Sequence, residues 1–213
     1  MMNAISTKNL TKKFKEAVVL DKVSIDFETG KVHGLIGRNG SGKTMLMKCI
    51  CGIVPPTSGE IYVNDQRIGK DTDIPKNVGV IIETPGFIPN YSSYNNLKFL
   101  AILNKKIGKA EIRNAISSVG LNPDDKKHVG KFSLGMRQRL GLAQAIMEDP
   151  DLLILDEPMN GLDKDGVKDM RQYLLDLKAK GKTILIASHS AEDIDILCDT
   201  VCEMDKGVLS AVR

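Results

Sequence analysis

One run of eight residues, Gly-Arg-Asn-Gly-Ser-Gly-Lys-Thr at positions 37–44, constrains this chain more than any other feature. It matches the pattern G-x-x-x-x-G-K-[ST], a loop that binds phosphate groups. Glycines in such a loop permit positive φ angles and a close approach of the backbone to phosphate. The bend also points N–H groups and a helix N-terminus at the anion. We expect every residue of the loop to contact nucleotide phosphates: Gly37, Arg38, Asn39, Gly40, Ser41, Gly42, Lys43 and Thr44.

The last two residues of the loop suit two parts of a nucleoside triphosphate. The Lys43 ammonium can reach the β- and γ-phosphates, and the Thr44 hydroxyl can ligate Mg²⁺. The alternative is a glycine-rich turn with a solvated lysine. The context disfavours that alternative, because residues 32–36 predict a buried strand just before the loop and residues 45–48 predict a helix just after it.

Composition and charge exclude several classes of protein. A length of 213 residues allows one substantial core, and a net charge of +3 is too weak to indicate a nucleic-acid partner or an anionic membrane. No apolar run approaches the roughly 18 residues of a membrane helix. The N-terminus, MMNAISTKNL, lacks the apolar core of a signal peptide. We therefore expect a cytoplasmic protein that reaches a membrane only through another chain.

The four cysteines do not form a framework for disulfides or metal. We predict reduced, largely buried thiols at Cys49, Cys51, Cys198 and Cys202.

Strand and helix patterns alternate along the chain and predict the fold class. Strands are expected at residues 24–27, 32–36, 60–63, 77–83, 152–155, 183–188, 201–204 and 208–212. Helices are expected at residues 42–52, 165–180 and 191–198. Strands that are apolar on both faces and alternate with helices indicate an α/β fold with a mostly parallel sheet covered on both sides.

The apolar spacing becomes helical between residues 92 and 147, as in the groups Leu97, Leu100, Ala101 and Ile112, Ala115, Ile116, Val119. We therefore predict a helical subdomain, residues 90–149, inserted into the α/β core of a single domain that spans residues 1–213.

Two carboxylates follow the predicted strand 152–155. Parallel strands deliver such side chains to the carboxyl edge of the sheet, where the phosphate loop also lies. Asp156 is expected to hold Mg²⁺, and Glu157 is a candidate general base for an attacking water. The alternative is a turn with two solvated acids. His189 follows the strand 183–188 to the same edge, where its imidazole could bond the γ-phosphate or the water; otherwise it is structural.

The order and spacing of these motifs resemble the nucleotide-binding domain of an ATP-binding cassette (ABC) transporter over nearly the whole chain. The segment 132–139, FSLGMRQR, is similar to the family signature, usually L-S-G-G-Q, and departs from it at Phe132, Leu134 and Met136. The resemblance implies a P-loop nucleoside triphosphatase core with a small antiparallel β region. It also implies that the chain binds ATP and Mg²⁺ and hydrolyses ATP.

Further site residues come only from this resemblance. Ser133 and Gly135 match the signature residues that touch the phosphate of ATP bound to a second copy. Asp163 lies in a segment similar to the D-loop, which communicates across the dimer. Phe14 stands where the family has an aromatic residue that stacks on adenine, although an ordinary core phenylalanine is the alternative.

Glu83 stands where the family has the glutamine of the Q-loop. A glutamine offers Mg²⁺ a neutral carbonyl, whereas an ionised glutamate adds a charge beside phosphates and metal. This departure resembles the subgroup that exports, or gives immunity to, bacitracin and lantibiotic peptides; unremarkable variation is the alternative. We predict that Glu83 is a metal-side ligand and a coupling residue.

The resemblance implies a homodimer on ATP binding and a separate permease, which would contact the transported compound. We expect a protein that lies at the inner face of the cell membrane and binds no nucleic acid. During hydrolysis, Lys43 and His189 would stabilise the developing charge. A soluble ABC-type ATPase of DNA repair or translation is the alternative, but such proteins usually carry long coiled coils or two cassettes. We also expect that any C-terminal regulatory tail is absent or was removed.

Overall fold

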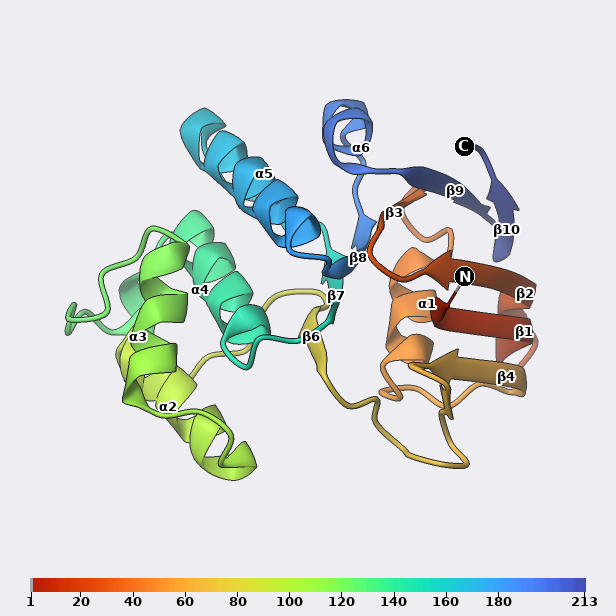
Figure 1. The fold of residues 1–213 in the computed structure, drawn as a ribbon. Helices are drawn as coiled ribbons and strands as arrows, with labels where there is room; N and C mark the ends of the chain where they lie inside the picture. Colours follow the sequence, from red (N-terminus) through yellow and green to blue (C-terminus); the bar gives the residue numbers. More distant parts are fainter. Residues whose placement is uncertain (1) are drawn as a thin grey trace.

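The computed structural model describes residues 2–213, apart from the side chain of Asn104, and its main sheet has the strand order β10-β9-β3-β8-β7-β6 (Figure 1). Five of these strands are parallel, and β10 pairs antiparallel with β9. The strands are β3 (Val32–Ile36), β6 (Val78–Ile81), β7 (Leu152–Asp156), β8 (Thr183–Ala187), β9 (Thr200–Asp205) and β10 (Val208–Ala211). The predicted α/β class with a mostly parallel sheet is confirmed.

A second, antiparallel sheet has the order β2-β1-β4-β5. Its strands are β1 (Asn3–Phe14), β2 (Ala17–Glu28), β4 (Ser58–Val63) and β5 (Gln66–Arg67). The sequence pattern does not predict β1, β5 or the first half of β2. The pairing of β1 with β2 shifts register at several points, including between Thr7 and Leu10, and such β-bulges break the alternation that identifies a strand.

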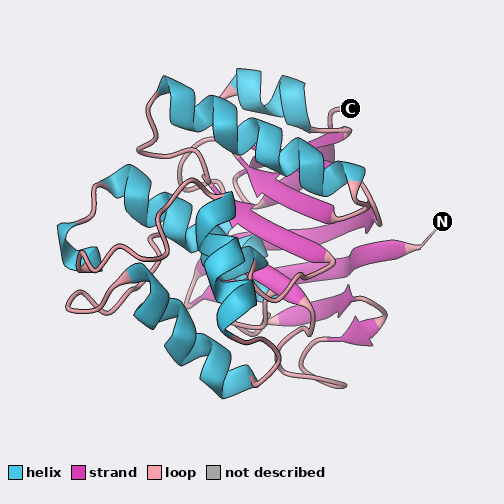
Figure 2. Cartoon of the chain, turned by 60° about the vertical axis from the view of Figure 1, so that its left-hand side comes forward, coloured by secondary structure: helices cyan, strands magenta, loops and turns pink. Residues whose placement is uncertain are grey.

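Helix α1 (Lys43–Ile50) lies between the two sheets (Figure 1). Its buried Leu46, Met47 and Ile50 belong to one apolar cluster with side chains from both sheets, such as Ile5 of β1 and Ile154 of β7. The other face of the main sheet packs against helices, which Figure 2 shows in cyan. Successive residues of a strand point to opposite faces, so the main sheet is buried on both sides.

The helical insertion lies between β6 and β7, which are neighbours in the main sheet. It consists of α2 (Ser93–Asn104), α3 (Lys109–Ser118), a short 3₁₀ helix (Val129–Lys131) and α4 (Leu134–Ile146). The helical spacing is confirmed, since Leu97, Ile116 and Leu140 are buried in one cluster with the sheet. The subdomain bounds, 90–149, stay a prediction.

Helices α5 (Lys164–Ala179) and α6 (Ala191–Leu197) follow β7 and β8 and cover the same face of the sheet as α4. A buried histidine connects the two sheets on the opposite face of the main sheet. His33 of β3 contacts the carbonyl oxygen of Glu28 through Nε2 at 2.8 Å and Thr200 Oγ1 through Nδ1 at 2.7 Å. Burial lowers the pKa of His33, which favours the neutral ring. This contact anchors the strand that leads into the phosphate loop.

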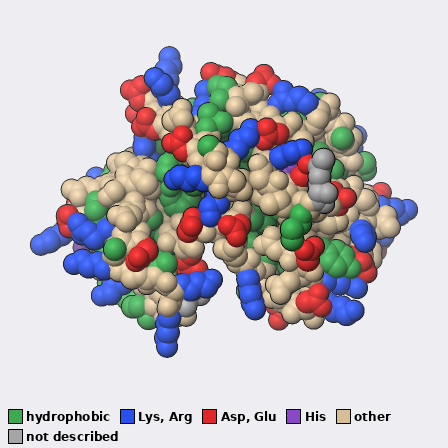
Figure 3. All heavy atoms as spheres, viewed as in Figure 1, with side chains coloured by type: hydrophobic (Ala, Val, Ile, Leu, Met, Phe, Trp, Pro, Cys, Tyr) green, Lys and Arg blue, Asp and Glu red, His purple; other side chains and the backbone are tan. Residues whose placement is uncertain are grey.

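The four cysteines are free and buried, as predicted. Burial raises the pKa of Cys51 and of Cys198 to about 12, so both thiols stay protonated at neutral pH. Across the described residues, none of the helices has the length and apolar character needed to traverse a bilayer. On the face seen in Figure 3, basic and acidic side chains are interspersed rather than gathered by sign.

Candidate functional site

The phosphate loop connects β3 to α1, as the sequence predicts. Gly37 has a φ of 141° and Gly42 has a φ of 119°, and residues other than glycine rarely adopt such angles. A Cβ on Gly37 would lie 2.2 Å from the carbonyl oxygen of Met204. The loop therefore depends on glycine at position 37 for both its conformation and its packing. Beside it lies a cavity of about 270 Å³, lined by residues 39–45 together with Val19, Asp156 and Glu157.

Two side chains in the loop fit an anionic ligand. The Lys43 ammonium donates to the carbonyl oxygens of Gly37 at 2.7 Å and of Arg38 at 3.2 Å, which holds the cation across the loop. The Ser41 hydroxyl is buried and, among the described residues, has no hydrogen-bond partner. Buried polar groups normally have partners, so this hydroxyl suits a phosphate oxygen.

Thr44 and Asp156 lie together at this edge, as predicted. The Thr44 hydroxyl donates to Asp156 Oδ2 at 2.7 Å, and Asp156 is 8% exposed. A hydroxyl and a carboxylate are oxygen ligands of the kind that Mg²⁺ takes. Within the described part of the chain, no three His, Cys, Asp or Glu side chains gather into a metal cluster. Mg²⁺ sites of one or two protein ligands completed by phosphates fit this sparse donor set.

Glu157 and His189, from the ends of β7 and β8, are joined by a contact of 2.8 Å between Oε2 and Nδ1. An ionised carboxylate only accepts hydrogen bonds, so Nδ1–H is the donor and the Nε2 of a neutral ring is an acceptor. Glu157 has a φ of 50°, and its N–H donates to the carbonyl oxygen of Ala187 at 2.9 Å. The side-chain amide of Gln138 in α4 donates to the carbonyl oxygen of Glu157 at 3.2 Å. The backbone of Glu157 is thus held in an unusual conformation from two sides.

Phe14 lies at the end of β1 and is 49% exposed. The Lys12 ammonium lies 4.8 Å from the centre of its ring. The alternative that Phe14 is an ordinary core residue is therefore wrong. An exposed aromatic face suits stacking on a base, and the role in adenine binding stays a prediction.

Glu83 lies just beyond β6, so the strand predicted at residues 77–83 ends earlier, at Ile81. Its carboxylate accepts from the Lys48 ammonium at 2.6 Å, and its side chain is 63% exposed. Lys48 is one helical turn after Thr44 in α1. The structure thus pairs Glu83 with a lysine beside the metal-side residues, and its role as a ligand stays a prediction. Sequence reasoning missed Lys48, although its spacing of four from Thr44 places both on one helix face.

Comparison with known proteins identifies the family. The family described as "ABC transporter" matches residues 20–160. The chain belongs to the ABC transporter family. It is the ATP-binding subunit of a transporter of this family and is an ATPase. The resemblance found in the sequence is confirmed.

Three relatives of this ABC protein cover nearly all of the chain. An uncharacterized ABC transporter ATP-binding protein of Bacillus subtilis (strain 168), YybJ, is 47% identical over 96% of this chain and 94% of its own length. The bacitracin transport ATP-binding protein BcrA of Enterococcus faecalis is 41% identical over 98% of this chain and 68% of its own. The lantibiotic transport ATP-binding protein SrtF of Streptococcus pyogenes is 39% identical over 92% and 85%.

A solved structure has the same fold as this ABC protein. It is the dimeric structure of a post-hydrolysis state of the ATP-binding cassette MJ0796 bound to ADP and Pi. The TM-score is 0.86 at 20% identity, over 98% of this chain and 99% of that chain. The similarity confirms the cassette fold.

The signature and D-loop residues of the ABC chain lie away from its own phosphate-loop cavity, which none of them lines. Ser133 caps α4 by accepting from the N–H of Met136 at 3.2 Å, and Asp163 caps α5 by accepting from the N–H of Gly166 at 2.9 Å. A Cβ on Gly135 would lie 2.8 Å from the carbonyl oxygen of Gly161, so the two segments touch each other. Within one chain, these residues do not complete the nucleotide site.

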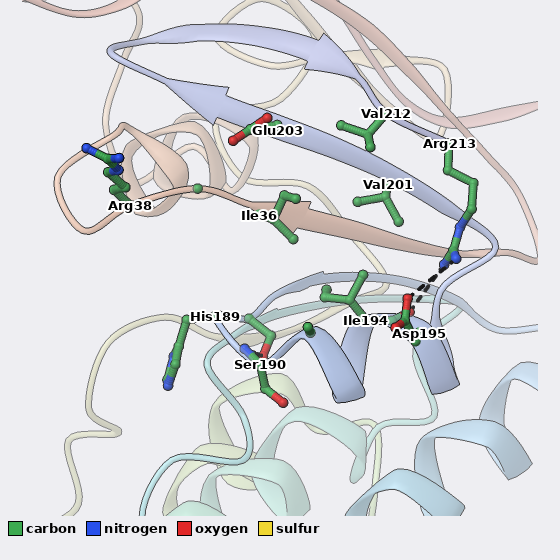
Figure 4. Close-up of a pocket in the computed structure, with 13 residues that line it drawn as sticks. Ile36, Arg38, His189, Ser190, Ile194, Asp195, Val201, Glu203, Val212 and Arg213 are labelled. Carbon is green, nitrogen blue, oxygen red and sulfur yellow. Dashed lines mark hydrogen bonds and ion pairs between the residues drawn. The ribbon is translucent and has the colours of Figure 1, made fainter.

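A larger, mostly apolar cavity of about 470 Å³ lies beside the phosphate loop of the ABC chain, between β3, β9 and α6. Figure 4 shows Arg38 and His189 toward one end of it and the ion pair of Arg213 with Asp195 at the other. Ile36, Ile194 and Val201 form part of its wall. The cavity borders the nucleotide site, and Arg38, His189 and Glu203 are among the polar side chains that line it.

Proposed function

We propose that this chain hydrolyses Mg-ATP as a homodimer and thereby drives a separate permease that exports a peptide antibiotic. The gathering of Thr44, Asp156, Glu157 and His189 around the phosphate loop is the observation that carries the ATP chemistry. It supports a site in which triphosphate, metal and attacking water would meet at one edge of the sheet.

The residues have separate roles in this proposal. The N–H groups of the loop and the Lys43 ammonium bind the phosphates, and Ser41 donates to a phosphate oxygen. Thr44 and Asp156 would hold Mg²⁺, which supplies charge neutralisation when bound. The Glu157 carboxylate accepts the proton of the attacking water, and His189 holds that carboxylate in place through Nδ1.

A second copy of the chain would complete each site. Ser133 and Gly135 are not at the phosphate loop of their own chain, and Ser133 is exposed. They would therefore contact ATP bound to the partner, with Asp163 beside them. The dimeric form of the MJ0796 cassette supports this arrangement. Isolated monomers should then bind ATP but hydrolyse it poorly.

The helical insertion presents an apolar surface that suits a permease. Tyr91 and Phe99 pack edge to face with their rings 5.1 Å apart, and both are more than 40% exposed. Ile102 and Leu103 continue the same face of α2, at 54% and 77% exposure. Exposed apolar groups gathered in this way are typical of a protein contact. We place the permease on this face, and hence the chain at the inner face of the cell membrane.

The proposed class of transported compound rests on the names of two relatives. BcrA is named for bacitracin transport and SrtF for lantibiotic transport, and both align with more than nine-tenths of this chain. Their names favour transport over a role in DNA repair or translation. We therefore propose export of a peptide antibiotic, with no nucleic-acid partner.

Transfer of resistance tests this function. The chain is expressed, together with the membrane protein encoded next to it, in a bacitracin-sensitive bacterium, and growth is measured against bacitracin and a lantibiotic. We expect the inhibitory concentration of one of them to rise, and only when both proteins are present. A pair that assembles in the membrane and hydrolyses ATP, but changes resistance to neither peptide, contradicts the proposed cargo class.

Replacing Glu83 by glutamine tests its proposed place beside the metal. Glu83→Gln removes a negative charge, so the Mg²⁺ concentration for half-maximal ATPase activity should rise by up to roughly fivefold. Lys48→Met is the matched control, because it frees the same carboxylate from its ion pair and should not raise that concentration. Unchanged Mg²⁺ dependence, turnover and resistance in Glu83→Gln would show that the residue has no special role.

A further inference from the structure

A buried ion pair lies outside the phosphate-loop cavity, between α5 and α6. Arg171 of α5 donates from Nε to Oδ1 of Asp193 at 2.7 Å. Asp193 is 3% exposed, and the side chain of Arg171 is 14% exposed. Arg171 also donates to the carboxylate of Glu192 at 3.0 Å, but the Glu192 side chain is 72% exposed. Only the pair with Asp193 is shielded from solvent.

The second oxygen of Asp193 ties this pair to the turn that carries His189. Ser188 donates from Oγ to Oδ2 of Asp193 at 3.2 Å, and the same Oγ accepts from the N–H of Ser190 at 3.1 Å. Ser190 in turn accepts at Oγ from the N–H of Asp193 at 3.3 Å. The two residues that flank His189 are therefore both bonded within one small network, while the imidazole itself is exposed (Figure 4).

The network depends on the positive charge of Arg171. A carboxylate that is almost fully buried is costly to keep ionised without a cation beside it. If Arg171 is removed, the buried carboxylate of Asp193 loses its cation and must turn toward solvent or toward other donors. Such a turn of the Asp193 side chain would remove the acceptor that holds the Ser188 hydroxyl, and it would thereby disturb the turn at His189.

We propose that Arg171 and Asp193 are positioning residues that set the imidazole of His189 against Glu157. This inference rests on the proposed role of His189 in ATP hydrolysis and adds the residues that place it. Helix α5 begins at the Asp163 cap and also carries Arg171, so the segment facing a second copy is physically joined to the turn of His189. The ion pair acts on hydrolysis through His189 and not on nucleotide binding.

Replacing Arg171 by methionine tests this assignment. Methionine keeps much of the length of the side chain and loses its charge and donors. We expect the kcat of ATP hydrolysis to fall by at least about tenfold, because small displacements of catalytic groups are costly. The affinity for ATP, measured by calorimetry in the absence of Mg²⁺, should stay within about twofold of the original value. Glu192→Gln removes only the exposed partner of Arg171 and should leave both quantities unchanged.

A double-mutant cycle separates positioning from general damage. In a chain that already carries His189→Ala, Arg171→Met should cause little further loss of kcat, since there is no imidazole left to place. If Arg171→Met slows the His189→Ala chain as much as it slows the original, the proposal is overturned. Loss of ATP affinity in parallel with kcat overturns it as well.

A folding defect does not prevent the test. If the Arg171→Met variant no longer unfolds cooperatively on heating, the Ser188→Ala variant is tested instead. That substitution removes only the hydroxyl that links Asp193 to the turn. The same fall in kcat at unchanged ATP affinity is expected, and a normal kcat overturns the proposal. Failure of the proposed function looks different: His189→Ala would then retain full turnover, or the original chain would hydrolyse no ATP.

Discussion

Glu157→Gln should reduce ATP turnover by about 10²- to 10⁴-fold, the range typical of losing a general base. The amide has the size of the carboxylate but cannot take a proton from water. Its carbonyl oxygen can still accept from His189 Nδ1, so the geometry at 2.8 Å should survive the change. ATP binding is then intact while hydrolysis fails, and the ATP-bound dimer should accumulate. Steady-state turnover and gel filtration with and without ATP measure the two effects.

A control for this result lies at the other end of the same strand. Asp151 precedes β7, and its exposed carboxylate accepts from Asn77 and Lys182. Asp151→Asn alters the same strand without touching the edge where the site lies, and turnover should be normal. Undiminished turnover in Glu157→Gln would refute the assignment of the base. A comparable loss in Asp151→Asn would mean that the strand, rather than the carboxylate, had been damaged.

Local motifs made the phosphate-loop edge predictable from the sequence. The loop at 37–44 combines glycines that need positive φ with a lysine and a threonine at set spacing, and the structure places it between β3 and α1. The run before Asp156 is apolar at every position, which identified β7 and the edge it reaches. Because parallel strands end at the same edge of a sheet, the sequence also predicted that Thr44 and Asp156 lie close together.

The antiparallel strand β1 was not predictable in the same way. Much of its sequence is polar, and the bulges around Leu10 place buried residues out of alternation. Its identity as a strand depends on pairing with β2 and β4, which come later in the chain. Phe14 was accordingly placed by family resemblance alone, and only the structure showed that its ring is exposed.

Ion pairs between distant segments lay beyond the reach of sequence patterns. Lys48 and Glu83 are 35 positions apart, and Arg171 and Asp193 are 22 apart. Charged residues on helices are usually solvated, so no pattern singles out Arg171, and the helical spacing of Lys48 from Thr44 does not identify Glu83 as its partner. Tertiary packing selected their partners, and each pair now explains how a segment at the site edge is held.

Lys43→Ala should have the other large effect, with ATP affinity falling about ten- to hundredfold, as expected for loss of charge-assisted hydrogen bonds. Lys43 is 7% exposed, and its ammonium lies across the loop on the carbonyl oxygens of Gly37 and Arg38. Alanine removes the cation that would meet the β- and γ-phosphates and leaves these carbonyl groups without their donor. Turnover should fall below detection, since the same charge would stabilise the transferred phosphate. Titration with ATP and a phosphate-release assay measure both losses.

The loss in Lys43→Ala must also be distinguished from a general effect of charge. Lys180→Ala removes an exposed lysine just beyond α5 and should leave ATP affinity and turnover unchanged. Lys43 is proposed to bind phosphate, whereas Glu157 is proposed to act only on water. The two variants should therefore differ in whether they form an ATP-bound dimer. Glu157→Gln should form an ATP-bound dimer, and Lys43→Ala should stay monomeric at the same ATP concentration. Dimerisation of Lys43→Ala with unweakened ATP binding would remove Lys43 from the phosphate site.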